Sequence, residues 1–302
     1  MPSSPLKPDQ IFRNFSTEMV PEPTGVKPQL KKLKGIRAVI FDVYGTLFQS
    51  AAGDISLAKE STSKKKREAI VRESLEAAGF YVLDEVTPIG ELFMDTIHAE
   101  QDIRRDQGMK YPEVDIVGVW EDLIGQLEAY ELIRGKVTRT KLELLAIHYE
   151  ARVNPVYPMP GVLDIVESVL DKGASLGIIS NAQKFTPLLF DTFFDDNVGD
   201  LGFEEIACIW SYEHGTAKPG TEIYNICIDR LQALDGIAPK EVLYVGNDRR
   251  NDIWPAQEVG FNTALFAGDK RSLRLREGDE ELNGVKPDVV VTELEQIAEC
   301  LA

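Results

Sequence analysis

Cysteine and histidine are scarce in this chain of 302 residues, which has three of each. The cysteines, Cys208, Cys227 and Cys300, lie far apart and match no metal-ligand spacing. Their odd number and apolar neighbours indicate reduced, mostly buried thiols, which are typical of a reducing compartment. The sequence therefore predicts neither structural disulfides nor a cysteine-based metal site.

Long apolar runs are also missing from the chain. No stretch of about 18 apolar residues occurs, and the N-terminal residues lack the apolar core of a signal peptide. We therefore expect a cytoplasmic protein without a membrane partner.

Positive charge is in deficit, because 33 Lys and Arg residues stand against 50 Asp and Glu residues, for a formal net charge of −17. A strongly negative surface repels the phosphate backbone of nucleic acids, so no nucleic-acid partner is predicted. The same surface repels phosphorylated metabolites. Such a substrate needs a bound cation or a focused lysine to enter a site.

Two types of segment are visible along the chain. Residues 1–35 are rich in proline and show little periodicity, which predicts an extended, flexible N-terminal arm. Beyond residue 36, short apolar runs typical of strands buried on both faces alternate with helical stretches, which predicts an α/β fold with a doubly wound parallel sheet. The expected strands are Ala38–Phe41, Leu176–Ser180, Ile206–Trp210, Val242–Gly246 and Thr263–Phe266, with Val289–Val291 as an edge strand.

About a hundred residues rich in helix formers separate the first strand from the second. We expect an inserted α-helical domain over residues 51–154, and an α/β core made of residues 36–50 and 155–302. The sequence leaves the oligomeric state open. The helices expected in the insert cover residues 64–78, 86–108, 114–132 and 139–150.

Polar side chains follow the ends of four expected strands. In an open α/β sheet, ligands bind outside the carboxyl ends of the strands, so we expect these side chains to share one edge. An aspartate follows the first strand, a hydroxyl and an amide end the second, a lysine follows the third, and an acidic segment follows the fourth. The residues are Asp42 with Tyr44, Gly45 and Thr46, then Ser180 and Asn181, then Lys218, then Asn247, Asp248 and Asp252.

This ordered set resembles the four motifs of the haloacid dehalogenase superfamily of hydrolases, over about residues 36–268. The resemblance implies a Rossmann-like core with a helical cap inserted after the first motif. It implies that Asp42 attacks phosphorus to give an aspartyl-phosphate, which water then cleaves. Lys218 would neutralise the developing charge, while Ser180 would donate a hydrogen bond to the phosphoryl group.

The resemblance also implies backbone amides and a cation at the phosphate. Gly45, Thr46 and Asn181 would complete a cradle for the phosphate. Mg²⁺ would be held by Asp42, the backbone carbonyl of Tyr44 and the acids of the fourth motif.

The fourth motif departs from the family pattern. The family's metal-binding acid falls on Asn247, and an acid stands one residue later, at Asp248. Asp248 and Asp252 are four residues apart and share one face if the segment is an α-helix. Whether Asn247 or Asp248 would bind the metal directly stays open.

Tyr44 is the second departure, because family phosphatases usually carry an aspartate there to protonate the leaving oxygen. General acid catalysis contributes about 10²–10⁴-fold, and a tyrosine with a pKa near 10 is a poor substitute. A halide leaves without a proton, so a metal-independent 2-haloacid dehalogenase is an alternative hypothesis. A binding module whose catalysis Tyr44 and Asn247 have weakened is another.

The leading hypothesis is a Mg²⁺-dependent phosphatase for a small phosphorylated substrate. The insert is expected to select that substrate. Four of its residues either reach the substrate or form a solvated helix face followed by a turn. They are Arg104, Arg105, Lys110 and Tyr111.

Overall fold

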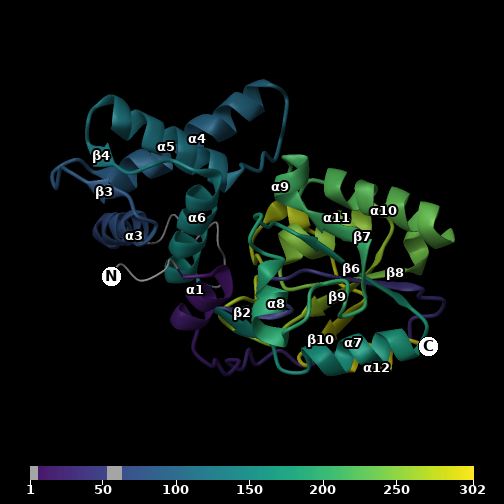
Figure 1. The fold of residues 1–302 in the computed structure, drawn as a ribbon. Helices are drawn as coiled ribbons and strands as arrows, with labels where there is room; N and C mark the ends of the chain where they lie inside the picture. The colour runs from purple at the N-terminus through teal and green to yellow at the C-terminus, as the bar shows by residue number, and fades with distance from the viewer. Residues whose placement is uncertain (1–5, 53–62) are drawn as a thin grey trace.

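The computed structural model describes residues 6–52 and 63–302, and Figure 1 shows their arrangement. Six parallel strands form one sheet in the order β10–β9–β8–β1–β6–β7. The central strand is entirely buried, as its continuous apolar run predicted. The strands are β1 (Ala38–Phe41), β6 (Ser175–Ser180), β7 (Phe203–Trp210), β8 (Val242–Gly246), β9 (Asn262–Phe266) and β10 (Val289–Val291).

Helices cover both faces of the sheet (Figure 1). Alternate residues of β1 point to opposite faces, so that Val39 and Phe41 join one hydrophobic cluster while Ala38 and Ile40 join another. This arrangement confirms the predicted doubly wound α/β fold. One face carries α7 (Val162–Asp171) and α12 (Gln296–Cys300), and the other carries α9 (Ser211–His214), α10 (Glu222–Asp235) and α11 (Trp254–Glu258).

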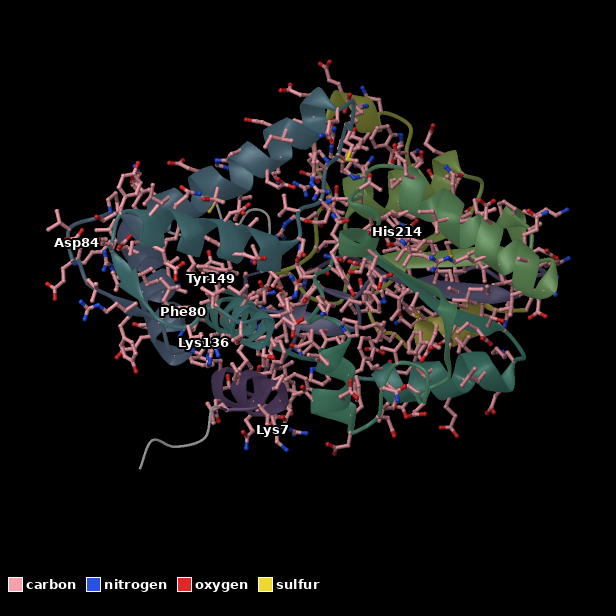
Figure 2. The ribbon with its side chains drawn as sticks, turned by 45° about the horizontal axis from the view of Figure 1, so that its top comes forward. Lys7, Phe80, Asp84, Lys136, Tyr149 and His214 are labelled. Carbon is pink, nitrogen blue, oxygen red and sulfur yellow. The ribbon has the colours of Figure 1, made fainter. Side chains whose placement is uncertain are left out.

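A helical insert lies between β2 (Phe48–Ser50) and β5 (Val156–Pro158), which pair antiparallel where the chain leaves and re-enters the core. The insert has its own aromatic centre, in which the rings of Phe93 and Trp120 stack at 4.1 Å. Tyr149, labelled in Figure 2, meets both rings edge-on. The insert's elements are α3 (Lys64–Ala77), β3 (Tyr81–Val82), α4 (Ile89–Asp106), α5 (Ile116–Ala129), β4 (Ile133–Arg134) and α6 (Arg139–Val153).

The prediction of an extended, flexible arm is wrong for residues 8–15. Residues 8–15 form α1 (Pro8–Phe15), which packs against α6 of the insert and α8 (Leu188–Phe194) of the core (Figure 1). Ile11 and Phe12 are 0% and 2% exposed. The helix therefore connects the insert to the core through buried apolar side chains. None of the helices within residues 6–52 and 63–302 is long and apolar enough to cross a membrane.

His148 makes the contact between α1 and α6 sensitive to acid. Its ring is 5% exposed, and its Nδ1 lies 3.2 Å from an Arg152 guanidinium nitrogen. That guanidinium in turn lies over the Phe15 ring of α1 at 4.3 Å, with Glu73 of α3 at 3.6 Å. Burial, with a further contribution from Arg152, lowers the pKa of His148 from 6.5 to about 4. Protonated His148 is therefore disfavoured in the folded state.

Acid should consequently destabilise the wild type more than a His148→Gln variant. Between pH 6.5 and about 4 the unfolded chain binds a proton at this position that the folded chain does not, so stability falls as the pH falls through that window. Allowing for solvent screening, we expect an extra loss of about 1–2 kcal/mol. Urea unfolding at about pH 7.5 and about pH 4.5 measures it, and equal losses in both proteins would contradict it.

Candidate active site

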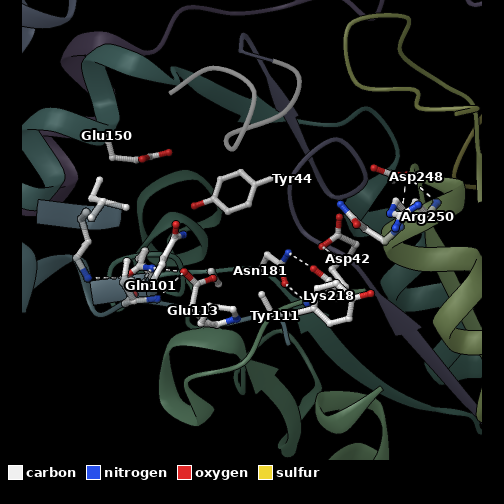
Figure 3. Close-up of a pocket in the computed structure, with 18 of the residues that line it drawn as sticks. Asp42, Tyr44, Gln101, Tyr111, Glu113, Glu150, Asn181, Lys218, Asp248 and Arg250 are labelled. Atoms are coloured by element: carbon white, nitrogen blue, oxygen red, sulfur yellow. Dashed lines mark hydrogen bonds and ion pairs between the residues drawn. The ribbon is translucent and has the colours of Figure 1, made fainter. Parts of the chain in front are cut away.

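A cavity of about 480 Å³ lies between the carboxyl ends of the central strands and the insert (Figure 3). Asp42, which directly follows β1, lines it together with Lys218 and Asn181 from the core. Tyr111 and Glu113 line it from the loop between α4 and α5. Both parts of the chain therefore contribute side chains to one cavity.

Lys218 is the centre of a buried charge cluster. Its Nζ lies 2.7 Å from Asp42 Oδ1 and 2.6 Å from Asp252 Oδ1, and its side chain is 3% exposed. The Ser180 hydroxyl donates to the same Asp42 oxygen at 2.9 Å. The structure thus brings together four of the predicted site residues, each delivered by a different strand end.

Asn181 holds the backbone of Lys218 in place. Its Oδ1 accepts from the Lys218 amide at 2.7 Å, and its Nδ2 donates to the Lys218 carbonyl at 3.2 Å. Both polar ends of the amide side chain are therefore engaged by one residue. This pairing fixes where Lys218 leaves the chain, so the lysine head can reach both carboxylates.

The protonation of this cluster follows from burial and charge together. Burial alone lowers the pKa of Lys218, but the Asp252 and Asp42 carboxylates outweigh it, so that the pKa is raised and the ammonium keeps its proton. Burial raises the pKa of Asp252 to about 7, against the attraction of Lys218, and the nearby charges of Asp42 and Asp248 add to the rise.

Tyr244 belongs to the cluster, although nothing in its sequence context identified it. The residue lies inside β8, where the apolar run predicted only a buried strand. Its hydroxyl accepts from Lys218 Nζ at 3.2 Å, and its single proton has two acceptors in reach, Asp252 Oδ1 at 3.1 Å and the Ile179 carbonyl at 3.0 Å. A buried tyrosine needs a hydrogen-bond partner for its hydroxyl. A tyrosine within an apolar strand was therefore the one sign in the sequence that polar groups lie nearby.

Tyr44 points away from Asp42 and towards Glu150 of the insert (Figure 3). Its hydroxyl lies 3.0 Å from Thr186 Oγ1. Burial, followed by the charge of Glu150, raises the pKa of Tyr44 well above 10. The tyrosine therefore keeps its proton and does not replace the missing acid beside Asp42.

The phosphate contacts of Gly45 and Thr46 stay a prediction, and neither residue is among those that line the cavity. The Gly45 amide donates to the Phe48 carbonyl at 2.7 Å, and the Thr46 hydroxyl donates to Asn247 Oδ1 at 3.3 Å. At Gly45, where φ is +83°, a Cβ would lie 2.6 Å from both Asn247 Nδ2 and Ser272 Cβ. Both residues therefore pack against and position Asn247.

The prediction that Asp248 and Asp252 share a helix face is also wrong. Residues Arg249–Ile253 form a π-helical turn, and Asp248 caps it by accepting from the Arg250 amide at 2.8 Å. The Asp248 carboxylate pairs with Arg276, whereas Asp252 accepts from the Asp248 amide at 2.8 Å and from Lys218. Each carboxylate already has its own cation.

These contacts do not fit the predicted Mg²⁺ ligand set of Asp42, the Tyr44 carbonyl, Asn247, Asp248 and Asp252. The Asn247 Nδ2 donates to the Ser272 carbonyl at 2.6 Å, which places an amide where the family carries an acid. Within residues 6–52 and 63–302, no three His, Cys, Asp or Glu side chains are grouped to hold a metal ion. A Mg²⁺ ion bound to Asp248 would have to displace Arg276, which contacts both oxygens of that carboxylate.

Comparison with known proteins gives the class to which this fold and site belong. The family model for haloacid dehalogenase-like hydrolases matches residues 36–260, so the chain belongs to that family. The glyceraldehyde 3-phosphate phosphatase of Methanocaldococcus jannaschii is 24% identical over 243 residues, which cover 78% of this chain and 86% of the relative.

Solved structures share the fold. A 2-haloacid dehalogenase from Pseudomonas syringae pv. Tomato DC3000 is 19% identical with a TM-score of 0.53, and the match covers 88% of this chain and 97% of that one. A haloacid dehalogenase-type phosphatase from Thermococcus onnurineus is also 19% identical with a TM-score of 0.48, covering 87% and 97%.

Proposed function

We propose that this hydrolase uses Asp42 as a covalent nucleophile on a small phosphorylated substrate whose leaving group departs without a proton. The observation that carries the proposal is the environment of Asp42 Oδ1, which Lys218 contacts at 2.7 Å and Ser180 at 2.9 Å. These two contacts orient the carboxylate at the wall of the cavity. They also pair it with a buried cation that keeps its charge.

In the proposed reaction an Asp42 oxygen forms a bond to phosphorus while the bond from phosphorus to the leaving oxygen breaks. The leaving group takes the electron pair and departs as an anion. Lys218, whose pKa is raised, stays protonated and balances the charge that accumulates on the phosphoryl oxygens. Water then attacks the phosphorus of the aspartyl-phosphate and regenerates Asp42. No step of this scheme passes through a metal ion.

The phosphatase relative supports phosphoryl transfer, and two features of the site restrict the substrates. Tyr44 does not serve as an acid, and the carboxylates do not fit Mg²⁺, so neither group assists a poor leaving group. Acyl and aryl phosphates, whose leaving groups have low pKa values, need no such help. The same two features favour a second candidate function, displacement of halide from a 2-haloacid by Asp42.

A panel of leaving groups tests this proposal. We expect kcat/KM for acetyl phosphate and aryl phosphates to exceed that for simple sugar phosphates by on the order of 10²-fold or more, since general acid assistance has that size. Tyr44→Phe should leave the ratio unchanged, because the hydroxyl points away from Asp42 and contacts Thr186. Equal rates for alkyl and aryl phosphates would contradict the proposal and require another acid.

The same panel separates the other hypotheses. Release of halide from 2-chloropropionate with no phosphate release would favour the dehalogenase. Binding of these anions without turnover would favour a binding module. The proposal includes a cytoplasmic location, which the buried, unpaired Cys208, Cys227 and Cys300 support. It includes no nucleic-acid or membrane partner.

A further inference from the structure

The segment between β9 and β10 brings residues to the cavity that lie outside the four sequence motifs. Two backbone hydrogen bonds, each 3.0 Å long, connect it to the fourth motif. The Arg274 amide donates to the Asn247 carbonyl, and the Arg249 amide donates to the Arg274 carbonyl. The Arg249 guanidinium also donates to the Leu275 carbonyl at 3.0 Å. Arg274 and Arg276 consequently line the cavity with Asp42 and Lys218.

Arg276 presents its guanidinium edge to Asp248. Its Nε donates to Asp248 Oδ1 at 3.1 Å, and a terminal nitrogen pairs with Oδ2, which is the bidentate geometry that arginine forms with carboxylates. The Arg276 backbone has a φ of +51°, a left-handed conformation that residues other than glycine adopt only where their surroundings maintain it. The loop therefore holds this guanidinium at a defined place in the wall.

Arg276 supplies the cation for one of the buried carboxylates of the site. Lys218 pairs with Asp42 and Asp252, and Arg276 pairs with Asp248. Without Arg276, the buried Asp248 carboxylate would lose its cation, and a carboxylate is a hard oxygen donor of the kind that Mg²⁺ and Mn²⁺ prefer. An arginine stays protonated at every working pH and does not have to be captured from solution.

We propose that Arg276 is the built-in cation of this site: it neutralises Asp248 in place of a metal ion and contributes positive charge to the binding of the anionic substrate. The site is then independent of divalent metal because its fourth-motif acid is already occupied. The claim that Arg276 helps to bind the substrate rests on the proposed function. The claim that Arg276 replaces a metal ion does not rest on it, because that claim concerns the apoprotein alone.

Metal binding to the apoprotein tests the inference directly. Mn²⁺ titrations followed by electron paramagnetic resonance are run on metal-stripped wild type, Arg276→Met and Arg250→Met. Arg250 is the control for metal binding, because it also lines the cavity and loses the same charge near the same turn, but its guanidinium pairs with Asp279 and Glu281 and not with Asp248. We expect Mn²⁺ to bind Arg276→Met at least about tenfold more tightly than it binds the other two proteins. Adding Asp248→Asn to Arg276→Met should remove the gain.

Equal Mn²⁺ affinity in all three proteins would overturn the inference, and so would tight binding to the wild type. Circular dichroism establishes that each variant is folded. Isothermal titration with inorganic phosphate then tests whether Arg276 helps to bind the substrate: Arg276→Met should weaken phosphate binding at least about tenfold, and Lys184→Met, which removes a cation that does not line the cavity, less than about twofold. If the wild type binds no phosphate at all, the proposed function fails, while the Mn²⁺ comparison still decides the role of Arg276.

Discussion

Replacing Asp42 by Asn should remove essentially all turnover of acetyl phosphate, by a factor on the order of 10⁴ or more. An amide keeps the shape of the side chain and can still accept from Lys218 and Ser180, but it is not a nucleophile. Lys218 remains paired with Asp252 in the variant, so the fold should survive with its unfolding free energy changed by no more than about 1 kcal/mol.

Steady-state kinetics with matched thermal unfolding curves measure both parts of this expectation. Asp191→Asn is the control, because it makes the same substitution at an exposed position on α8, away from the cavity. It should keep wild-type kinetics. If Asp42→Asn retained even a tenth of the wild-type rate, Asp42 would not be the covalent nucleophile.

Lys218→Met should damage both catalysis and folding. The lysine is buried between two carboxylates that would lose their cation together. Breaking a buried ion pair from one side costs about 3–5 kcal/mol, and we expect a loss of this size in urea unfolding, with turnover reduced on the order of 10³-fold or more.

The loss caused by Lys218→Met should depend on pH. The folded-state pKa of Asp252, already raised to about 7 by burial, rises further without the lysine, while the unfolded value stays near 3.8. The folded chain therefore binds the extra proton between these values, and the variant is more stable at about pH 5 than at about pH 8. Lys184→Met, which removes an exposed pair with Glu143, should cost no more than about 1 kcal/mol at either pH. Equal costs for both variants would mean that Lys218 is not the centre of the cluster.

The strands and the helices of the insert were predictable because their signals are local. β8 (Val242–Gly246) matches its predicted bounds, and α3 (Lys64–Ala77) differs by one residue at its end. α1 was missed because prolines flank it and because its two buried residues gain their stability from α6 and α8, which lie far away in sequence. Ile11, Phe12 and Phe15 do have helical spacing, but a segment of eight residues is too short for that pattern alone to predict a stable helix.

The sequence predicted those residues of the site that follow the ends of the parallel strands. Asp42, Ser180, Lys218 and Asp252 meet because parallel strands deliver their carboxyl ends to one edge. The shared face of Asp248 and Asp252 was predicted wrongly because their spacing was interpreted as an α-helix, whereas the segment is a π-helical turn. The contribution of Arg276 depends on how a separate loop docks. The only local sign of it was the basic run at residues 270–276.

The central claim is a covalent bond to Asp42, and one measurement tests it most directly. The wild type is mixed with excess acetyl phosphate, quenched in acid during turnover, digested and analysed by mass spectrometry. We predict that the peptide containing Asp42 carries one additional phosphoryl group, that fragmentation places the group on Asp42, and that Asp42→Asn carries none. An unmodified Asp42 peptide during active turnover, or a phosphoryl group on another residue, would contradict the account.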